Sequence, residues 1–200
     1  LVEATKQAFL VRDREVADPE AMGVPAQSLL KETVLEQLAG AVDHRKAMPW
    51  PRRSDPGDTI WMGAIDGEGT AVSFIQSLYW EFGSGLVLEE TGLVWQNRGA
   101  GFTLDPGRRN VLGPCKLPFH TLNPALAVLN DGRVMVYGTM GGDGQPQTQA
   151  AVFTRYACFG GDLRAAVSAP RWLLGRTWGQ ASDTLKMEAG LFDANGPALS

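Results

Sequence analysis

Histidine and cysteine, the two residue types that most often carry metal or thiol chemistry, are scarce in this sequence. Its 200 residues contain two histidines and two cysteines. Cys115 and Cys158 fit no C-x-x-C or Cys/His ligand spacing, so neither a metal motif nor a disulfide framework is predicted. A bond between these two cysteines and two free thiols are both compatible with the sequence. We expect no metal and no organic cofactor.

Positive charge and long apolar runs are lacking as well. The formal net charge is −4 and the sequence pI is about 5.2, which argues against binding to nucleic acid or to an anionic membrane. No apolar run is long enough to span a bilayer, and the opening "LVEATKQAFLVRDREV" is too charged for a signal peptide. We therefore expect neither a nucleic-acid nor a membrane partner. A cytoplasmic location is favoured over a periplasmic one, without being decided.

The first quarter of the chain has helical periodicity. Apolar residues recur at spacings of three and four over residues 1–12 and 26–42, which predicts a helix in each range. The stretch "VADPEAMGVP" between them is a predicted loop. Residues 44–58 are a predicted linker, since prolines at 49, 51 and 56 exclude a helix.

After residue 58 the pattern changes to short strands. "TIWMGAID" and "TAVSFIQSLYW" predict a hairpin that turns at "DGEG", and two further extended pieces flank Gly92. A second hairpin is expected to turn at residues 130–132. Helices are predicted over residues 147–158, ended by the following glycines, and over 162–169 with Asp162 as N-cap, and a strand is predicted within 183–192. Helices, then strands, then helices indicate the α+β class.

Few catalytic motifs are present. The sequence contains no G-x-S-x-G, Walker loop or H-E-x-x-H. His44 is expected on the surface, whereas His120 in "LPFHTLNP" fits either a structural hydrogen bond or a substrate contact. "GTMGGDGQPQ" has the form strand, glycine turn, helix, which suits a nest of backbone N–H groups for an anion or an oxyanion, or simply a tight turn.

Thr59 directly follows the linker. This position fits an ordinary strand start, and it also fits a nucleophile exposed by cleavage of the Asp58–Thr59 bond. The freed α-amino group, with a reference pKa of about 7.7–8.0, could serve as the base for the hydroxyl of the same residue.

Nearly the whole chain resembles the γ-glutamyltransferase family of N-terminal-nucleophile hydrolases. The resemblance rests on six motifs in the family's order: "DTIWMGAIDGEGTAVSFIQS", "FGSG", "TGLVWQNRGAGF", "LPFHTLNPALAV", "GTMGGDGQPQTQAAVF" and "AVSAPRW". It implies an αββα sandwich with antiparallel sheets and self-cleavage before Thr59. Residues 1–58 would be the helical end of the large subunit plus the linker, and 59–200 the catalytic small-subunit segment, both parts of one domain. The chain looks like an internal piece of a longer protein, in which the sandwich could be incomplete.

The resemblance also implies roles for single residues. Asp58 and Thr59 would flank the cleavage site. Thr59 would be both nucleophile and α-amino base, and Ser77 would hydrogen-bond to it. Gly141 and Gly142 would form the oxyanion hole, while His120 and Thr121 would grip the substrate carboxylate.

Four departures from the family pattern bear on the substrate, and one is that His120-Thr121 stands where the family has a pair of serines. The family's Thr-Thr-His reads Thr59-Ile60-Trp61, and its acidic residue for the substrate α-amino group aligns with Gly101. A neighbouring polar position reads Arg98, either an anion clamp or a surface-loop arginine. We therefore expect a small carboxylate amide without an α-amino group, as in the subgroup that includes oxamate amidohydrolase.

Two other functions fit the sequence. One is a true γ-glutamyltransferase or glutathione hydrolase, against which Gly101 speaks. The other is a non-catalytic structural or binding relative that never cleaves its own chain. Ile60 and Trp61, which replace the family's residues beside the nucleophile, are compatible with it. Expected partners are a small-molecule amide, the remaining large-subunit segment, and either a homo-oligomer or a heterodimer of the cleavage products.

Overall fold

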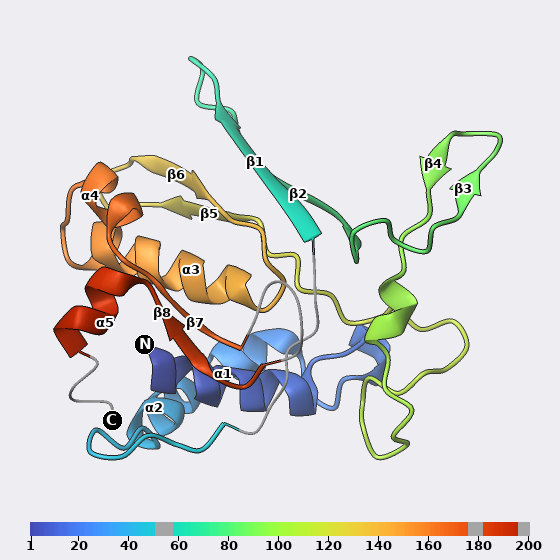
Figure 1. Cartoon of the computed structure of the whole chain (residues 1–200), viewed down its shortest axis with the longest axis horizontal. Coiled ribbons are helices and arrows are strands. Elements are labelled where there is room, and N and C mark those ends of the chain that lie inside the picture. Colours follow the sequence, from blue (N-terminus) through green and yellow to red (C-terminus); the bar gives the residue numbers. More distant parts are fainter. Residues whose placement is uncertain (51–57, 176–181, 196–200) are drawn as a thin grey trace. The chain divides into compact units, whose positions relative to one another are not determined.

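The computed structural model describes residues 1–50, 58–175 and 182–195 (Figure 1). The chain divides into two compact units. The first contains Leu1–Trp50 and Asn97–His120, and the second contains Pro51–Gln96 and Thr121–Ser200. Residues 51–57 of the linker predicted over 44–58 lie outside the described residues.

Helices dominate the beginning of the first unit. Helix α1 (Val2–Glu15) buries Phe9 and Lys6, and the Lys6 Nζ donates hydrogen bonds to Glu3 Oε1 and to the Met48 carbonyl, both over 2.6 Å. The helix predicted over residues 1–12 is thus confirmed and runs three residues further. A 3₁₀ turn, Pro19–Ala21, interrupts the predicted loop, where the Asp18 side chain accepts from the Glu20 N–H.

The single helix predicted over residues 26–42 is wrong. A 3₁₀ helix covers Ala26–Leu30, and helix α2 (Glu32–Gly40) starts only after Lys31, whose ψ of 141° is extended. The hydroxyl of Ser28 donates to the Pro25 carbonyl over 2.7 Å, a local bond that competes with a regular helix. Apolar periodicity spans the break, but Leu30 and Leu35 are both exposed, so it does not mark one packed face.

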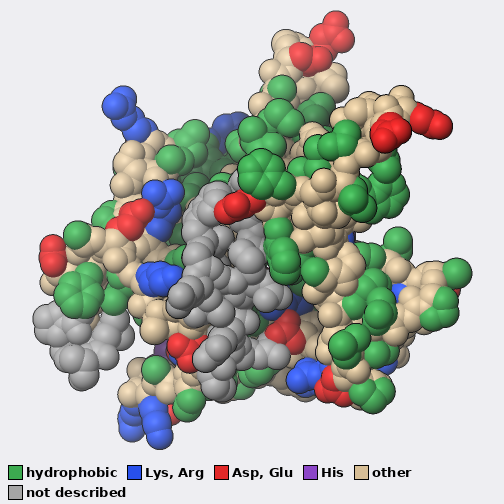
Figure 2. Space-filling view, turned by 45° about the vertical axis from the view of Figure 1, so that its right-hand side comes forward, with side chains coloured by type: hydrophobic (Ala, Val, Ile, Leu, Met, Phe, Trp, Pro, Cys, Tyr) green, Lys and Arg blue, Asp and Glu red, His purple; other side chains and the backbone are tan. Residues whose placement is uncertain are grey.

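Two long strands open the described part of the second unit. Strands β1 (Asp58–Ile65) and β2 (Ala71–Tyr79) pair antiparallel, as predicted. The turn between them is held by Asp66, whose Oδ1 accepts from the backbone N–H of Glu68 and Thr70. Ile75 is buried on one face of the hairpin, whereas large apolar side chains on the other face are exposed, namely Ile60, Met62, Val72 and Phe74. Hydrophobic side chains reach the surface in many places (Figure 2).

Six shorter strands form three more antiparallel pairs. These are β3 (Val87–Leu88) with β4 (Leu93–Val94), β5 (Ala125–Val128) with β6 (Val134–Tyr137), and β7 (Trp172–Leu174) with β8 (Leu185–Met187). The hairpin of β5 and β6 was predicted, and β3 and β4 match the two extended pieces predicted around Gly92, whereas β7 was not predicted. The strand expected within 183–192 ends at Met187, and helix α5 (Ala189–Asn195) follows it. Within the described ranges every sheet has two strands.

The remaining helices follow β6. Helix α3 (Gly144–Phe153) begins three residues before its predicted start and continues as a π-helical turn, Thr154–Cys158. The glycines after it end the helix as predicted: Gly160 has a φ of 68°, and the Gly161 N–H donates to the Arg155 carbonyl over 2.9 Å. Helix α4 (Leu163–Ser168) is capped by Asp162, which accepts from the Ala165 N–H.

The α+β class with antiparallel pairing is therefore confirmed. Cys115 and Cys158 are both free and exposed. Among the described helices none has the length and apolarity that crossing a bilayer would take.

Candidate active site

Thr59 lies at the start of β1 and is joined to the neighbouring strand through its side chain. Its Oγ1 donates a hydrogen bond to Ser77 Oγ on β2 over 3.0 Å. Ser77 Oγ also accepts from the Tyr79 backbone N–H over 2.9 Å. The Thr59 hydroxyl is thus held in one orientation by a side chain that is itself held by the backbone.

The hairpin is irregular at the same place. Asp58 pairs with Tyr79 and Ile60 with Gln76, so Thr59 alone faces two residues of β2, Ser77 and Leu78. Such a β-bulge re-aims side chains and is common beside active sites. Tyr79, which closes the bulge, has a φ of 81° although it is not a glycine, and it is 8% exposed. Backbone strain of this kind persists only where the surroundings enforce it, here by burial of the tyrosine.

Strand β6 lies along the β1–β2 hairpin. A Cβ added to Gly63 would lie 3.0 Å from Val136 Cγ2, and one added to Gly138 would lie 2.1 Å from Trp61 Cδ1. Going from the first contact to the second, the residue number falls on β1, from 63 to 61, and rises along β6 and its end, from 136 to 138. The end of β1 that carries Thr59 is therefore directed toward the end of β6 that continues into the glycine turn.

Gly141 and Gly142 form that turn. Both are buried, with φ values of 108° and 52°. Their carbonyls accept from the N–H groups of Gly144 and Gln145 over 2.7 and 3.1 Å, which starts α3. A tight turn can direct successive backbone N–H groups toward one spot, as in an anion or oxyanion nest, and glycine permits the positive φ values that this turn requires. A tight turn and a nest are both compatible with this geometry.

A buried glutamine that sequence reasoning missed holds the turn in place. Gln147 on α3 is 0% exposed and donates from Nε2 to the carbonyls of Asp143 and Leu174 over 2.9 and 3.0 Å. Its Oε1 accepts from the Leu174 N–H over 2.7 Å. The side chain therefore joins the glycine turn to strand β7. The polar repeat in "GQPQTQ", on a helix that follows a buried turn, was the available signal.

The other two glutamines of that repeat behave differently. Gln149 donates from Nε2 to the carbonyl and the side-chain oxygen of Asn123 over 3.0 and 2.7 Å, which fixes the segment that begins with half-buried Thr121. Gln145 is also 0% exposed, yet neither atom of its amide has a hydrogen-bond partner among the described residues.

Arg98 and His120 belong to the first unit. Arg98 begins a 3₁₀ helix, Arg98–Gly101, and is 7% exposed, so its reading as a surface-loop arginine is wrong. His120 keeps contact with solvent. Desolvation by neighbouring protein atoms, and secondarily the positive charge of Arg98, lower the pKa of His120 below its ordinary value. The neutral imidazole is therefore favoured at pH 7. His44 is exposed, as expected.

Asn110, which sequence reasoning also missed, joins these two segments of the first unit. Its Nδ2 donates to the Gly101 carbonyl over 2.8 Å, and its Oδ1 accepts from the Phe119 N–H over 3.3 Å. A Cβ on Gly101 would lie 3.3 Å from the Phe119 carbonyl, so an acidic side chain at this position would be crowded by a backbone oxygen.

The second unit thus brings together the Thr59–Ser77 pair and the strand that leads to Gly141 and Gly142, and the first unit brings together Arg98 and His120. The catalytic and binding roles of these residues and of Thr121 stay predictions. Among the described residues no group of three or more His, Cys, Asp or Glu side chains could hold a metal ion.

Comparison with known proteins gives consistent results. The gamma-glutamyltranspeptidase family matches residues 1–199. The oxamate amidohydrolase proenzyme of Klebsiella pneumoniae is 62% identical over 188 residues, which are 94% of this chain and 36% of that protein. The glutathione hydrolase-like YwrD proenzyme of Bacillus subtilis is 44% identical over 96% of this chain and 37% of its own length.

Among solved structures, cephalosporin acylase from Bacillus halodurans shares the fold, with a TM-score of 0.83 and 35% identity over 99% of this chain and 35% of that chain. The chain thus spans a little over a third of the length of the Klebsiella and Bacillus subtilis relatives named above. Its fold is that of the N-terminal-nucleophile hydrolases, and the chain belongs to the gamma-glutamyltranspeptidase family.

Proposed function

We propose that this chain is part of a self-processing amidohydrolase that uses Thr59 as its nucleophile. The observation that carries the proposal is the hydrogen bond from Thr59 Oγ1 to Ser77 Oγ at a bulged strand start. Strand β6, beside that hairpin, leads into two buried glycines with positive φ. A fixed hydroxyl and a set of backbone donors are the two parts that acyl transfer requires.

Processing comes first. The Thr59 hydroxyl attacks the Asp58 carbonyl carbon, and the peptide C–N bond breaks, so that the acyl group moves from nitrogen to oxygen. Water then hydrolyses the resulting ester. The acyl shift thus frees the α-amino group of Thr59, and the hydrolysis leaves a carboxylate at residue 58 and frees the Thr59 hydroxyl. The free amine, with an ordinary pKa of about 7.7–8.0, accepts protons near neutral pH.

Substrate turnover uses the same atoms. The α-amine takes the hydroxyl proton while Thr59 Oγ1 attacks the substrate amide carbonyl. Backbone N–H groups of the Gly141–Gly142 turn stabilise the oxyanion that forms. The amine then gives its proton to the leaving nitrogen, ammonia departs, and water hydrolyses the acyl-enzyme ester. A single oxyanion donor is typically worth about 2.7–4 kcal/mol of transition-state stabilisation.

For the substrate we propose a small carboxylate amide of the oxamate class. Arg98 is a buried cation near His120, and a guanidinium binds carboxylates through charge-assisted hydrogen bonds. Gly101 offers no acidic group to a substrate ammonium. In the proposal Arg98, His120 and Thr121 hold the substrate carboxylate. The 62% identical Klebsiella relative is named an oxamate amidohydrolase proenzyme, which supports this choice.

The test uses the full-length protein and its Thr59→Ala and Thr59→Ser variants. Gels and intact masses should show two fragments that meet between Asp58 and Thr59 in the wild type, slower cleavage in Thr59→Ser and none in Thr59→Ala. Ammonia release from oxamate should follow the same order. An intact Thr59→Ala chain with wild-type ammonia release would refute the nucleophile. Turnover of a γ-glutamyl anilide with no ammonia from oxamate would instead favour a glutathione hydrolase.

A further inference from the structure

The indole of Trp61 fills a space made by two glycines, one within β1 and one directly after β6. A Cβ on Gly138, which follows β6, would lie 2.1 Å from Trp61 Cδ1 and 2.4 Å from its Nε1. A Cβ on Gly63, within β1, would lie 2.6 Å from Trp61 Cζ2. The five-membered ring therefore lies against Gly138 and the six-membered ring against Gly63. No other residue type fits at either position without moving the indole.

Hydrogen bonds continue this contact across β2. The Trp61 Nε1–H donates to Ser73 Oγ over 3.0 Å, and Ser73 Oγ in turn reaches the Tyr137 carbonyl over 3.5 Å. Ser73 pairs with Gly63 in the hairpin register. Trp61 on β1 and Ser73 on β2 are thus hydrogen-bonded in series to the backbone carbonyl of Tyr137. Tyr137 is the last residue of β6 and directly precedes Gly138.

The position of this contact relates it to the reacting groups. Trp61 lies two residues after Thr59, and Gly138 lies three residues before Gly141. We infer that Trp61 is a positioning residue whose indole fixes the spacing between the strand that carries Thr59 and the turn that carries Gly141 and Gly142. The inference rests on the proposed function and deepens it, because it assigns a role to a residue that departs from the family's Thr-Thr-His.

A spacer of this kind affects kcat more than KM. Trp61 acts on the distance between nucleophile and oxyanion donors, and a misplacement of about 1 Å of reacting groups typically costs about 100-fold in rate. A tryptophan that only filled the core would lower stability without separating kcat from KM.

The experiment is a double-mutant cycle in the full-length protein with Trp61→Ala, Gly138→Ala and both together, and Trp95→Phe as control. Trp95 is 53% exposed in the hairpin that contains β3 and β4. Gly138→Ala pushes a methyl group into the indole, so kcat for amide hydrolysis should fall by about 10- to 100-fold with KM within about twofold. With Trp61→Ala already present, Gly138→Ala should cost little more, because the clash partner is gone. Additive losses, or an unchanged kcat in Gly138→Ala, would overturn the inference.

A second measurement does not depend on catalysis. Hydrogen exchange followed by mass spectrometry should show faster exchange of the peptide covering residues 138–146 in Gly138→Ala and Trp61→Ala, and wild-type exchange in Trp95→Phe. The amides of Gly144 and Gln145, bonded to the two glycine carbonyls, lie in this peptide. An inactive, uncleaved wild type would refute the proposed function, yet the exchange data would still decide whether Trp61 holds the turn. Unaltered exchange in both variants would refute that.

Discussion

Gln147 and Leu174 exchange two hydrogen bonds, in which the glutamine amide takes the place of a neighbouring strand. Its Oε1 accepts from the Leu174 N–H, and its Nε2 donates to the Leu174 carbonyl. Leu174 is 3% exposed, so these backbone groups are withdrawn from water. A third bond, to the Asp143 carbonyl, connects the same amide to the glycine turn. One side chain on α3 therefore fixes the turn and strand β7 together.

Substitution of Gln147 by methionine should destabilise the protein by about 1–3 kcal/mol, because buried backbone groups lose their partners. Gln145→Met is the matched control, since Gln145 is equally buried, lies on the same helix and has no amide partner among the described residues. It should be neutral or stabilising. Urea unfolding of both variants measures this, and equal losses would contradict the assignment.

Ser77→Ala should slow both self-cleavage and amide turnover by about tenfold, the effect of losing about one hydrogen bond to the nucleophile. Ser77→Thr keeps a hydroxyl and should therefore retain most of the rate of self-cleavage and most of the rate of amide turnover. Ser84→Ala is the control, because it also removes a serine hydroxyl, one that donates to the Trp95 carbonyl and accepts from the Leu86 N–H, but in the hairpin of β3 and β4. Rates come from time-resolved gels and ammonia release. Wild-type rates in Ser77→Ala would show that Ser77 does not contribute to either reaction.

Gly142→Ala should lower kcat by about 100-fold, the low end for loss of an oxyanion donor, because alanine at a φ of 52° forces the turn to shift. Gly69→Ala serves for comparison. It places alanine at a φ of 88° in the β1–β2 turn, with nothing within 4 Å of the new methyl group. Both changes should cost about 1–2 kcal/mol of stability, and only the first should reduce activity. An active Gly142→Ala enzyme would argue for a plain turn.

Titration of His120 by NMR should give a pKa below the ordinary value of about 6.5. Arg98→Gln should raise this pKa only partly, because the larger cause, desolvation, remains. A pKa unchanged by Arg98→Gln would show that the two side chains do not interact.

The same shift has a consequence for stability. A folded-state pKa below the unfolded one means that the unfolded chain binds more protons in the window just below pH 6.5, so unfolding becomes easier as the pH falls through it. His120→Gln should flatten this part of the stability curve, as measured by thermal unfolding at several pH values.

The hairpins were predictable from the sequence because turn chemistry and strand residues coincide, as at Asp66 and at residues 130–132. The break at Lys31 was not, because a hydroxyl bond at Ser28 competes with helix formation while apolar periodicity continues across it. Strand β7 was missed because its backbone at Leu174 is held by Gln147, a partner distant in sequence.

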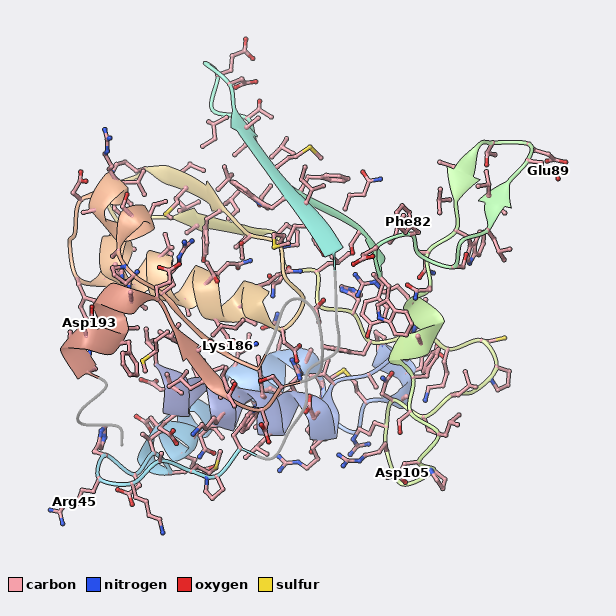
Figure 3. The ribbon with its side chains drawn as sticks, viewed as in Figure 1. Arg45, Phe82, Glu89, Asp105, Lys186 and Asp193 are labelled. Carbon is pink, nitrogen blue, oxygen red and sulfur yellow. The ribbon has the colours of Figure 1, made fainter. Side chains whose placement is uncertain are left out.

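At the candidate site, sequence resemblance named Thr59, Ser77 and the glycine pair. The bulge at Thr59 and the positive φ of Tyr79 have no local sequence signal, because burial of the tyrosine enforces them. Phe82, in the connection between β2 and β3, is by contrast a large aromatic side chain that is not buried, since it is 79% exposed (Figure 3).

The exposed apolar row on the β1–β2 hairpin has a practical consequence. Ile60, Met62, Val72 and Phe74 are between 46% and 57% exposed on a two-stranded sheet. Contiguous apolar side chains beside unpaired strand edges promote association between copies. Expression of these 200 residues alone should therefore yield material that aggregates as concentration rises, and laboratory work on the nucleophile is better begun with the longer chain.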